Sequence, residues 1–188
     1  TILHNTVHNL GIASIHGQMP LNFANRTNNK GLEQLFKTLN GETLQYNLPA
    51  HLLNQTGKVK GEIVGGNLAI FNSLISTKYE VDTAGKILFI EEVGEYLYRF
   101  DRLMYHLKMS GKLSKLKGLI VGGLSDMQDN EPAFGQTAEE IIYDLVKEYD
   151  YPVCFGFPAG HIKENFPIIL GAKISLSVSE SGTEIEFQ

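Results

Sequence analysis

The sequence predicts an α/β fold in which parallel strands alternate with helices. Three apolar runs, residues 86–91, 116–126 and 153–157, have the length and composition of buried strands. Two segments with apolar residues at helical spacing, 96–113 and 137–149, separate these runs. Because strands that alternate with helices commonly join one sheet in parallel, we expect a parallel-containing α/β layer.

The first 45 residues are predicted to be the last pieces of a separate α/β unit, and residues 46–188 a second domain. The sequence changes from helix-like to strand-like and turn-like between residues 42 and 50, near Pro49, and we place the domain boundary there. The elements expected in the first part are a helix over 1–10 ended by Gly11, a strand over 12–17, a loop over 20–31 and a helix over 31–41.

The second domain is expected to open with a strand that stops at a Gly-Gly turn. Gly65 and Gly66 would form this turn, and Asn67 would cap a helix over 67–75. A phosphate-binding loop is a less apt interpretation, because a third glycine and a Lys-Ser/Thr ending are missing. At the other end, alternating residues on both sides of a Ser-Gly turn predict a hairpin over 172–187.

Composition and charge disfavour several classes of function. The 188 residues carry a net charge of −5, the pI is near 5.7 and no stripe of Lys and Arg appears, so we expect no nucleic-acid partner. No apolar run could cross a bilayer and no export signal is visible, so we expect no membrane partner and a cytoplasmic location. The single cysteine, Cys154, lies in an apolar run and is interpreted as a small core residue.

Two polar residues follow predicted parallel strands where binding sites commonly gather. Glu91 ends the strand over 86–91, and His161 follows the strand over 153–157 in the turn "FPAGH". A carboxylate that orients an imidazole is part of the set used in nucleophilic catalysis. An acid that caps the next helix and a histidine that fills a turn explain the same residues equally well, so both interpretations remain open.

Neighbouring charged residues have structural explanations. Glu92 and Glu95 are expected at the positive end of the helix that follows. We expect Arg99 and Arg102 to pair with Glu95 and Asp101 on that helix, although Arg99 could instead face a carboxylate ligand.

No metal or cofactor is expected. His16 ends a predicted strand and could lie near a site, but no partner at metal-ligand spacing accompanies it. Ser125 follows a buried strand as a nucleophile would, yet Met127 and a polar loop follow where a nucleophile elbow needs a small residue and a helix. Ser125 is therefore rejected as the nucleophile.

Four ordered blocks cover nearly the whole chain and resemble one family. They are "EIVGGNLAIFNSLI", "ILFIEEVGEYLYRFDRLMYHLKMSGKL", "GLIVGGLSDM" and "FGFPAGH". In this order they resemble the LD-carboxypeptidases, the serine peptidases of the muramoyltetrapeptide carboxypeptidase and microcin-immunity group. The resemblance implies a Rossmann-like N-terminal α/β domain with the nucleophilic serine, followed by a C-terminal swivelling β/β/α-type domain with a glutamate and a histidine. It also implies removal of the terminal D-alanine from murein tetrapeptides in cell-wall recycling, without a metal, by a homodimer.

Carried over by position, the resemblance assigns the glutamate to Glu91 and the histidine to His161. Asn67, Gly66 and Gly160 are expected on the substrate side of the same site. Thr1 resembles the threonine of the family's nucleophile elbow, which implies a serine about three residues upstream of this chain. The 188-residue chain is therefore expected to be inactive by itself.

Two other functions remain open beside the LD-carboxypeptidase. One is a microcin-type immunity amidase that cleaves a peptidyl or aminoacyl nucleotide, which a stacking aromatic residue for the base would favour. The other is a non-catalytic peptide-binding module that uses the same cleft. A serine in a "G-[FY]-S-D" sequence just before Thr1 would favour an enzyme, and another residue in its place the binding module.

Overall fold

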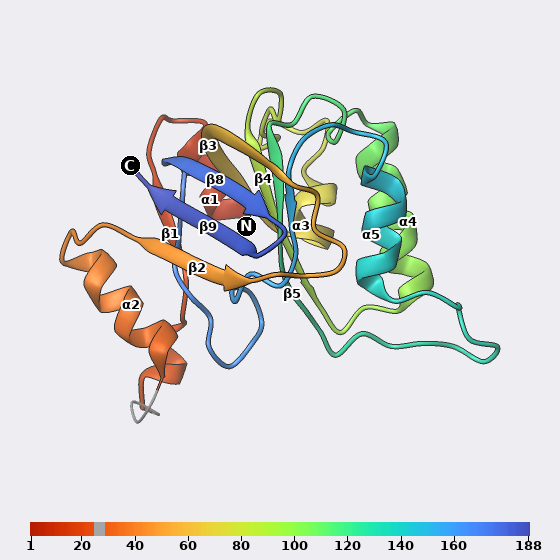
Figure 1. Cartoon of the computed structure of the whole chain (residues 1–188), viewed down its shortest axis with the longest axis horizontal. Helices are drawn as coiled ribbons and strands as arrows, with labels where there is room; N and C mark the ends of the chain where they lie inside the picture. The colour runs from red at the N-terminus through yellow and green to blue at the C-terminus, as the bar shows by residue number, and fades with distance from the viewer. Residues whose placement is uncertain (25–28) are drawn as a thin grey trace.

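The fold is built on one seven-stranded mixed sheet, seen in a computed structural model that describes residues 1–24 and 29–188 (Figure 1). The strand order is β2-β9-β8-β3-β4-β5-β6. Strands β3 to β6 run parallel to one another, and β2, β9, β8 and β3 pair antiparallel. The predicted mixed α/β class and the parallel layer are therefore confirmed. The strands of this sheet are β2 (Gln45–Pro49), β3 (Gly57–Asn67), β4 (Ile87–Val93), β5 (Gly118–Ser125), β6 (Val153–Cys154), β8 (Lys173–Ser179) and β9 (Gly182–Phe187).

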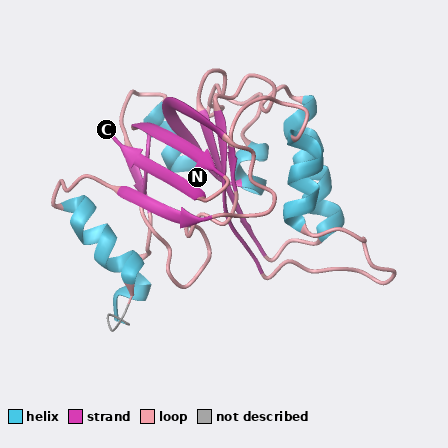
Figure 2. Ribbon diagram, viewed as in Figure 1, coloured by secondary structure: helices cyan, strands magenta, loops and turns pink. Residues whose placement is uncertain are grey.

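Helices cover the parallel part of the sheet. The two longer ones, α4 (Leu97–Met109) and α5 (Ala138–Val146), pack side by side against it, and the short α3 (Leu68–Ser73) follows β3 (Figure 2). Helix α5 begins with a capping box, in which Thr137 and Glu140 exchange side-chain and main-chain hydrogen bonds. No helix in the described ranges has the length and apolar character of a membrane span.

Strand β4 forms the centre of the core because both of its faces are covered. Leu88 and Ile90 pack into the cluster beneath the helices, whereas Ile87 and Phe89 pack into the cluster on the opposite face. This alternation follows from the two-residue period of a strand. Each of these side chains is fully buried, which stabilises the fold by roughly 1.5–3 kcal/mol per side chain.

The prediction of a Gly-Gly turn is wrong. Gly65 and Gly66 continue strand β3 and pair with Phe89 and Ile90. Close approach of the neighbouring strand explains the glycines: a Cβ on Gly65 would lie 1.8 Å from the Phe89 carbonyl oxygen, and the φ of Gly65 is +134°. The expected cap is confirmed, since the Asn67 side chain accepts a hydrogen bond from the Ile70 N–H.

Two other predicted segments differ in extent. The strand expected over 153–157 is only the two residues of β6, because the chain then turns toward the end of β5. The segment expected as a loop over 20–31 contains a 3-10 helix, η1 (Pro20–Ala24), while residues 25–28 of that prediction lie outside the described residues. Cys154 is fully buried, and burial raises the pKa of its thiol to about 11, as expected for a core residue.

The N-terminal segment lies against the rest of the chain through a second, two-stranded sheet. It contains α1 (Ile2–His8), β1 (Ser14–His16) and α2 (Lys30–Leu39), close to the predicted positions. Strand β1 pairs antiparallel with β7 (Ile168–Leu170), a strand that the sequence analysis missed. This pairing joins the part before the predicted domain boundary to the part after it.

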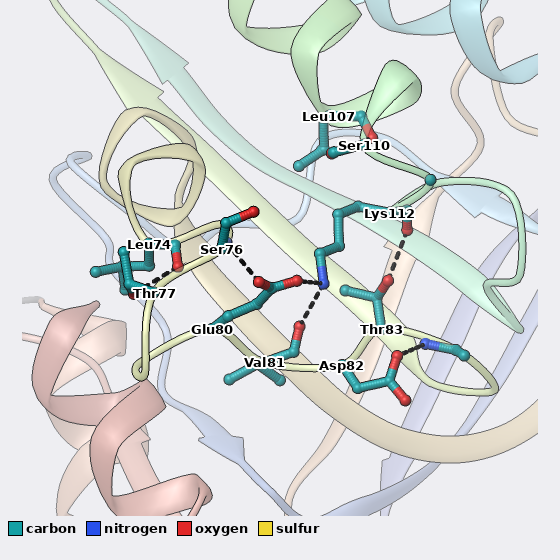
Figure 3. A network of polar contacts seen from close by, with 12 residues as sticks. Leu74, Ser76, Thr77, Glu80, Val81, Asp82, Thr83, Leu107, Ser110 and Lys112 are labelled. Carbon is teal, nitrogen blue, oxygen red and sulfur yellow. Dashed lines mark hydrogen bonds and ion pairs between the residues drawn. The ribbon is translucent and has the colours of Figure 1, made fainter.

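A buried lysine fixes the loop between α3 and β4 to the segment after α4 (Figure 3). The Lys112 ammonium forms an ion pair with Glu80 and donates a hydrogen bond to the Val81 carbonyl at 3.1 Å. Thr83 donates from its hydroxyl to the Lys112 carbonyl at 2.8 Å. Because the Lys112 residue is only 8% exposed, its charge depends on these partners.

Glu80→Gln is expected to lower the free energy of unfolding by about 1–3 kcal/mol at pH 7, because it leaves the Lys112 charge without its carboxylate. The hydrogen bond from Lys112 lowers the pKa of Glu80 below its ordinary value of 4.5. The unfolded state therefore binds the proton more readily, and the stabilisation is present above the ordinary pKa and lost as pH falls through the lower, folded-state pKa.

Urea unfolding at several pH values measures this effect, with the exposed Glu180→Gln as the matched control. The stability difference between the wild type and Glu80→Gln should shrink as pH falls below 4.5. The double variant Glu80→Gln/Lys112→Met should lose less stability than Glu80→Gln alone. Equal stability of wild type and Glu80→Gln at pH 7 would contradict the assignment.

Candidate active site

The candidate site lies at the carboxyl ends of the parallel strands. Strand β3 ends at Asn67, which pairs in register with Glu91 of β4, and β5 ends at Ser125. The turn after β6 brings His161 to the same edge. Ligands of parallel α/β sheets bind at this edge, because loops converge there and side chains leave the core.

Glu91 and His161 form a hydrogen-bonded pair across this edge. The Nδ1 atom of His161 lies 2.9 Å from Oε2 of Glu91. Glu91 is 1% exposed, whereas the His161 side chain is 52% exposed. The carboxylate therefore holds one ring nitrogen from inside the protein and leaves Nε2 for a group in the open space above.

One extra residue in β5 lets the turn over residues 157–161, the histidine turn, approach Glu91. Between Ile90 and Glu92 of β4 the register with β5 shifts by one residue, at Gly122 and Gly123. The Gly123 N–H donates a hydrogen bond to the Ala159 carbonyl at 2.8 Å. A Cβ on Gly122 would lie 2.5 Å from that same carbonyl oxygen, so the glycine permits the contact.

Side chains from three segments hold the histidine turn in place. The Gly160 N–H donates to the side-chain oxygen of the buried Asn165 at 2.8 Å, and the Ser125 hydroxyl donates to the His161 carbonyl at 2.8 Å. Gln18, also buried, donates from Nε2 to the Lys163 carbonyl at 3.1 Å. Sequence reasoning missed Asn165 and Gln18. The partner of Gln18 is 145 positions away in the sequence, so no local pattern signals Gln18.

Glycine is required at position 160. Its φ is +119°, and a Cβ there would lie 2.9 Å from Oε2 of Glu91. Any side chain would therefore push against the carboxylate that holds His161. Gly160 also lines the cavity described below, and its contact with substrate stays a prediction.

Gly66 and Asn67, also expected on the substrate side, contact Thr1 instead of the cavity. The Asn67 N–H donates to the Thr1 hydroxyl at 2.9 Å, and a Cβ on Gly66 would lie 2.7 Å from that hydroxyl oxygen. The Asn67 side chain is already bonded to Ile70 and to Glu92. Gly66 and Asn67 thus contact Thr1, and Thr1 itself lines the cavity.

The expectation that Glu92 serves the helix after it is wrong. Glu92 is a strand residue, 3% exposed, and its carboxylate accepts hydrogen bonds from the Ala69 N–H at 2.8 Å and the Asn67 side-chain amide at 2.7 Å. It therefore stabilises the beginning of α3, which lies beside β4 in space although it precedes β4 in sequence.

The predictions for the start of α4 were partly correct. Glu95 accepts a hydrogen bond from the Tyr96 N–H and pairs with Arg99 at 3.8 Å, as expected. Arg102 does not form the expected ion pair with Asp101 within the described residues, since its guanidinium lies over the Tyr98 ring, 5.2 Å from the centroid.

A cavity of about 600 Å³ opens above the Glu91 and His161 pair. Its lining comes from the N-terminal segment and from the ends of β4, β5 and β6: Thr1, His4, Ile15, His16, Gly17, Gln18, Met19, Asn22, Val93, Asp126, Gly160, His161, Ile162, Lys163 and Asn165. The lining residues come from distant parts of the sequence, so the cavity forms only when the chain is folded.

His16 is a second imidazole in this cavity. Burial, followed by the nearby His4, lowers the pKa of His16 to about 4, so the ring is uncharged at neutral pH. Its Nδ1 atom is buried and has no hydrogen-bond partner among residues 1–24 and 29–188, and the ring packs edge-on against Phe89. The predicted position of His16 at a strand end is confirmed, since it is the last residue of β1.

Within residues 1–24 and 29–188, no three His, Cys, Asp or Glu side chains gather closely enough to hold a metal ion. The site offers a carboxylate and an imidazole in hydrogen-bond contact, an arrangement suited to proton transfer and to activation of a hydroxyl nucleophile.

Comparisons with known proteins agree on one family. The model of the "LD-carboxypeptidase C-terminal domain" matches residues 60–176. A "probable murein peptide carboxypeptidase" of Bacillus subtilis is 31% identical over 192 residues, covering 99% of this chain and 60% of that protein. The microcin C7 self-immunity protein MccF of Escherichia coli is 25% identical over 136 residues, which cover 71% of this chain and 38% of MccF.

The fold agrees as well. The crystal structure of a muramoyltetrapeptide carboxypeptidase from Oxalobacter formigenes superimposes with a TM-score of 0.87 at 23% identity, covering 99% of this chain and 64% of that one. The chain thus spans about 60% of the length of such relatives. Because the family model matches well over half of its residues, the chain belongs to the LD-carboxypeptidase family.

Proposed function

We propose that the protein is a serine-type LD-carboxypeptidase that releases the terminal D-alanine from murein tetrapeptides in cell-wall recycling. The hydrogen bond between His161 and the buried Glu91 is the single observation that carries this proposal. The names of two relatives, the murein peptide carboxypeptidase of Bacillus subtilis and the murein tetrapeptide carboxypeptidase of Pseudomonas aeruginosa, support the substrate class. The proposal includes a cytoplasmic homodimer and no metal.

The nucleophile in this proposal is a serine just upstream of Thr1. Thr1 lies on the wall of the cavity that contains His161, so a residue a few positions earlier would reach the same space. The 188-residue chain would then be inactive by itself, because both the serine and the oxyanion donors near it would be missing.

The mechanism follows from the tautomer that Glu91 favours. Glu91 accepts a hydrogen bond from Nδ1–H of His161, so Nε2 is free to take the serine proton as the serine oxygen attacks the carbonyl carbon of the L,D bond. Nε2 then gives this proton to the nitrogen of the departing D-alanine. A water molecule, deprotonated by the same nitrogen, releases the peptide from the serine.

A second function, an immunity amidase that cleaves peptidyl or aminoacyl nucleotides, is favoured by the similarity to MccF. Cleavage of an aminoacyl sulfamoyl adenosine but not of a tetrapeptide would support it. A non-catalytic peptide-binding module is the third candidate, and a residue other than serine at the upstream position would support that one.

In the full-length protein, Glu91→Gln is expected to lower kcat for tetrapeptide hydrolysis by roughly 10²–10⁴-fold with a small change in KM. The amide keeps the shape of the carboxylate but cannot stabilise the imidazolium or fix the tautomer. His161→Ala should abolish turnover, and a change at an exposed acid outside the cavity lining, Glu42→Gln, should behave as wild type. A Glu91→Gln variant with full kcat would contradict the assigned role.

Ser125→Ala should reduce kcat/KM of the full-length protein by less than about tenfold, because it removes only the hydrogen bond to the His161 carbonyl. The 188-residue chain should hydrolyse no tetrapeptide. Hydrolysis by this shorter chain that disappears on Ser125→Ala would make Ser125 the nucleophile and overturn the proposal of an upstream serine.

A further inference from the structure

Thr1 occupies the position before the first turn of α1, where a threonine commonly caps a helix. A capping hydroxyl accepts a hydrogen bond from a main-chain N–H of that turn. Within the described helix the Thr1 hydroxyl makes no such bond. It accepts instead from the N–H of Asn67 at 2.9 Å, 66 positions further along the chain. The hydroxyl therefore joins the beginning of α1 to the end of β3 in place of stabilising its own helix.

The residue that Thr1 contacts is itself held by two neighbouring elements. The Asn67 side chain accepts a hydrogen bond from the Ile70 N–H of α3 at 3.1 Å and donates one to Glu92 of β4 at 2.7 Å. Asn67 is only 7% exposed, so little water is available to replace the Thr1 hydroxyl. Asn67 is thus a fixed point of attachment for the segment that contains Thr1.

The lack of a side chain at Gly66 makes room for this contact. A Cβ there would lie 2.7 Å from the Thr1 hydroxyl oxygen and 3.1 Å from its methyl carbon. The φ of Gly66 is +136°, a conformation that residues with side chains rarely adopt. The close approach at Gly66 and the hydrogen bond at Asn67 together fix the position of Thr1 relative to β3.

Two adjacent strands therefore position both parts of the proposed catalytic set. Glu91 of β4 holds His161 at 2.9 Å. The in-register neighbour of Glu91 on β3 is Asn67, which holds Thr1. The proposed serine lies about three residues before Thr1, and so short a segment spans at most about 11 Å. The contact at Thr1 consequently limits how far the serine oxygen can move from the imidazole.

We propose that Thr1 is a positioning residue of the reaction. Its hydroxyl anchors the segment with the nucleophilic serine to the end of β3, so that the serine oxygen lies within hydrogen-bond reach of Nε2 of His161. This inference rests on the proposed function, because it requires the upstream serine. Thr1 acts through that serine and takes no part in bond making or proton transfer.

The expected effect is on the chemical step. Valine has the shape of threonine but lacks the oxygen that accepts the Asn67 N–H. A displacement of about 1 Å between reacting groups can lower a rate about 100-fold. In the full-length protein, Thr1→Val should therefore lower kcat for the tetrapeptide by about 10–100-fold and leave KM nearly unchanged. Thr1→Ser keeps the hydroxyl and should restore most of the wild-type kcat.

Labelling of the serine gives a readout that does not depend on the peptide substrate. A fluorophosphonate forms a phosphorus–oxygen bond with an activated serine and loses fluoride, while the serine proton passes to the imidazole. Thr1→Val should slow this labelling by about the same factor as kcat, and Thr1→Ser should not. The matched control is Thr6→Val, because Thr6 lies on the same helix, donates to the Ile2 carbonyl at 2.8 Å and is not part of the cavity lining. This control should behave as wild type in both assays.

Urea unfolding verifies that each variant is folded under the assay conditions. Thr1→Ala, which also removes the hydroxyl, takes the place of Thr1→Val if valine prevents folding. Wild-type kcat and labelling rate without the hydroxyl would overturn the inference and leave the proposed function standing. Equal losses in Thr1→Ser and Thr1→Val, or a raised KM at unchanged kcat, would also overturn it. A wild type that hydrolyses no tetrapeptide, with labelling that slows in Thr1→Val and recovers in Thr1→Ser, would contradict the proposed function and support the inference.

Discussion

The buried carboxylate of Glu91 is the constraint on which the site depends. A charge at a 1% exposed position costs several kcal/mol unless a partner compensates it, and the His161 ring at 2.9 Å is that partner. The surrounding structure serves this contact. Gly122 lets the histidine turn approach β5, and Gly160 leaves room for the carboxylate beside the main chain. The imidazole is consequently oriented by the core of the protein, although half of it is open to the cavity.

Strand geometry gives the two adjacent glutamates separate roles. Successive side chains of a strand point to opposite faces, so Glu91 lies on the face of Phe89 and Glu92 on the face of Ile90. The first face leads to the cavity and the second to the beginning of α3. Glu92 stabilises that helix through Ala69 and holds the side chain of its cap, whose N–H in turn binds Thr1. One pair of acids thereby connects both faces of the sheet to the same site.

The sequence was sufficient for features that depend on local patterns. The parallel layer, the helices α4 and α5 and the placement of Glu91 and His161 at strand ends all follow from periodicity and strand order. The errors at Gly65 and Glu92 arose because their reasons are tertiary: the first accommodates a neighbouring strand, and the second serves a helix that precedes it in the chain. Gln18 carries no local signal at all, since its partner is 145 residues away.

The cavity also relates the two predicted domains to each other. Its walls come from Thr1, His16 and Gln18 before the predicted boundary and from His161 and Lys163 after it. The pairing of β1 with β7 and the hydrogen bond from Gln18 hold these walls together. Sites between structural units are common because two surfaces can enclose a ligand that neither could enclose by itself. The position of the proposed catalytic imidazole therefore depends on contacts made by the N-terminal segment, and a change in β7 that loosens it from β1 would act on the cavity although β7 is not part of its lining.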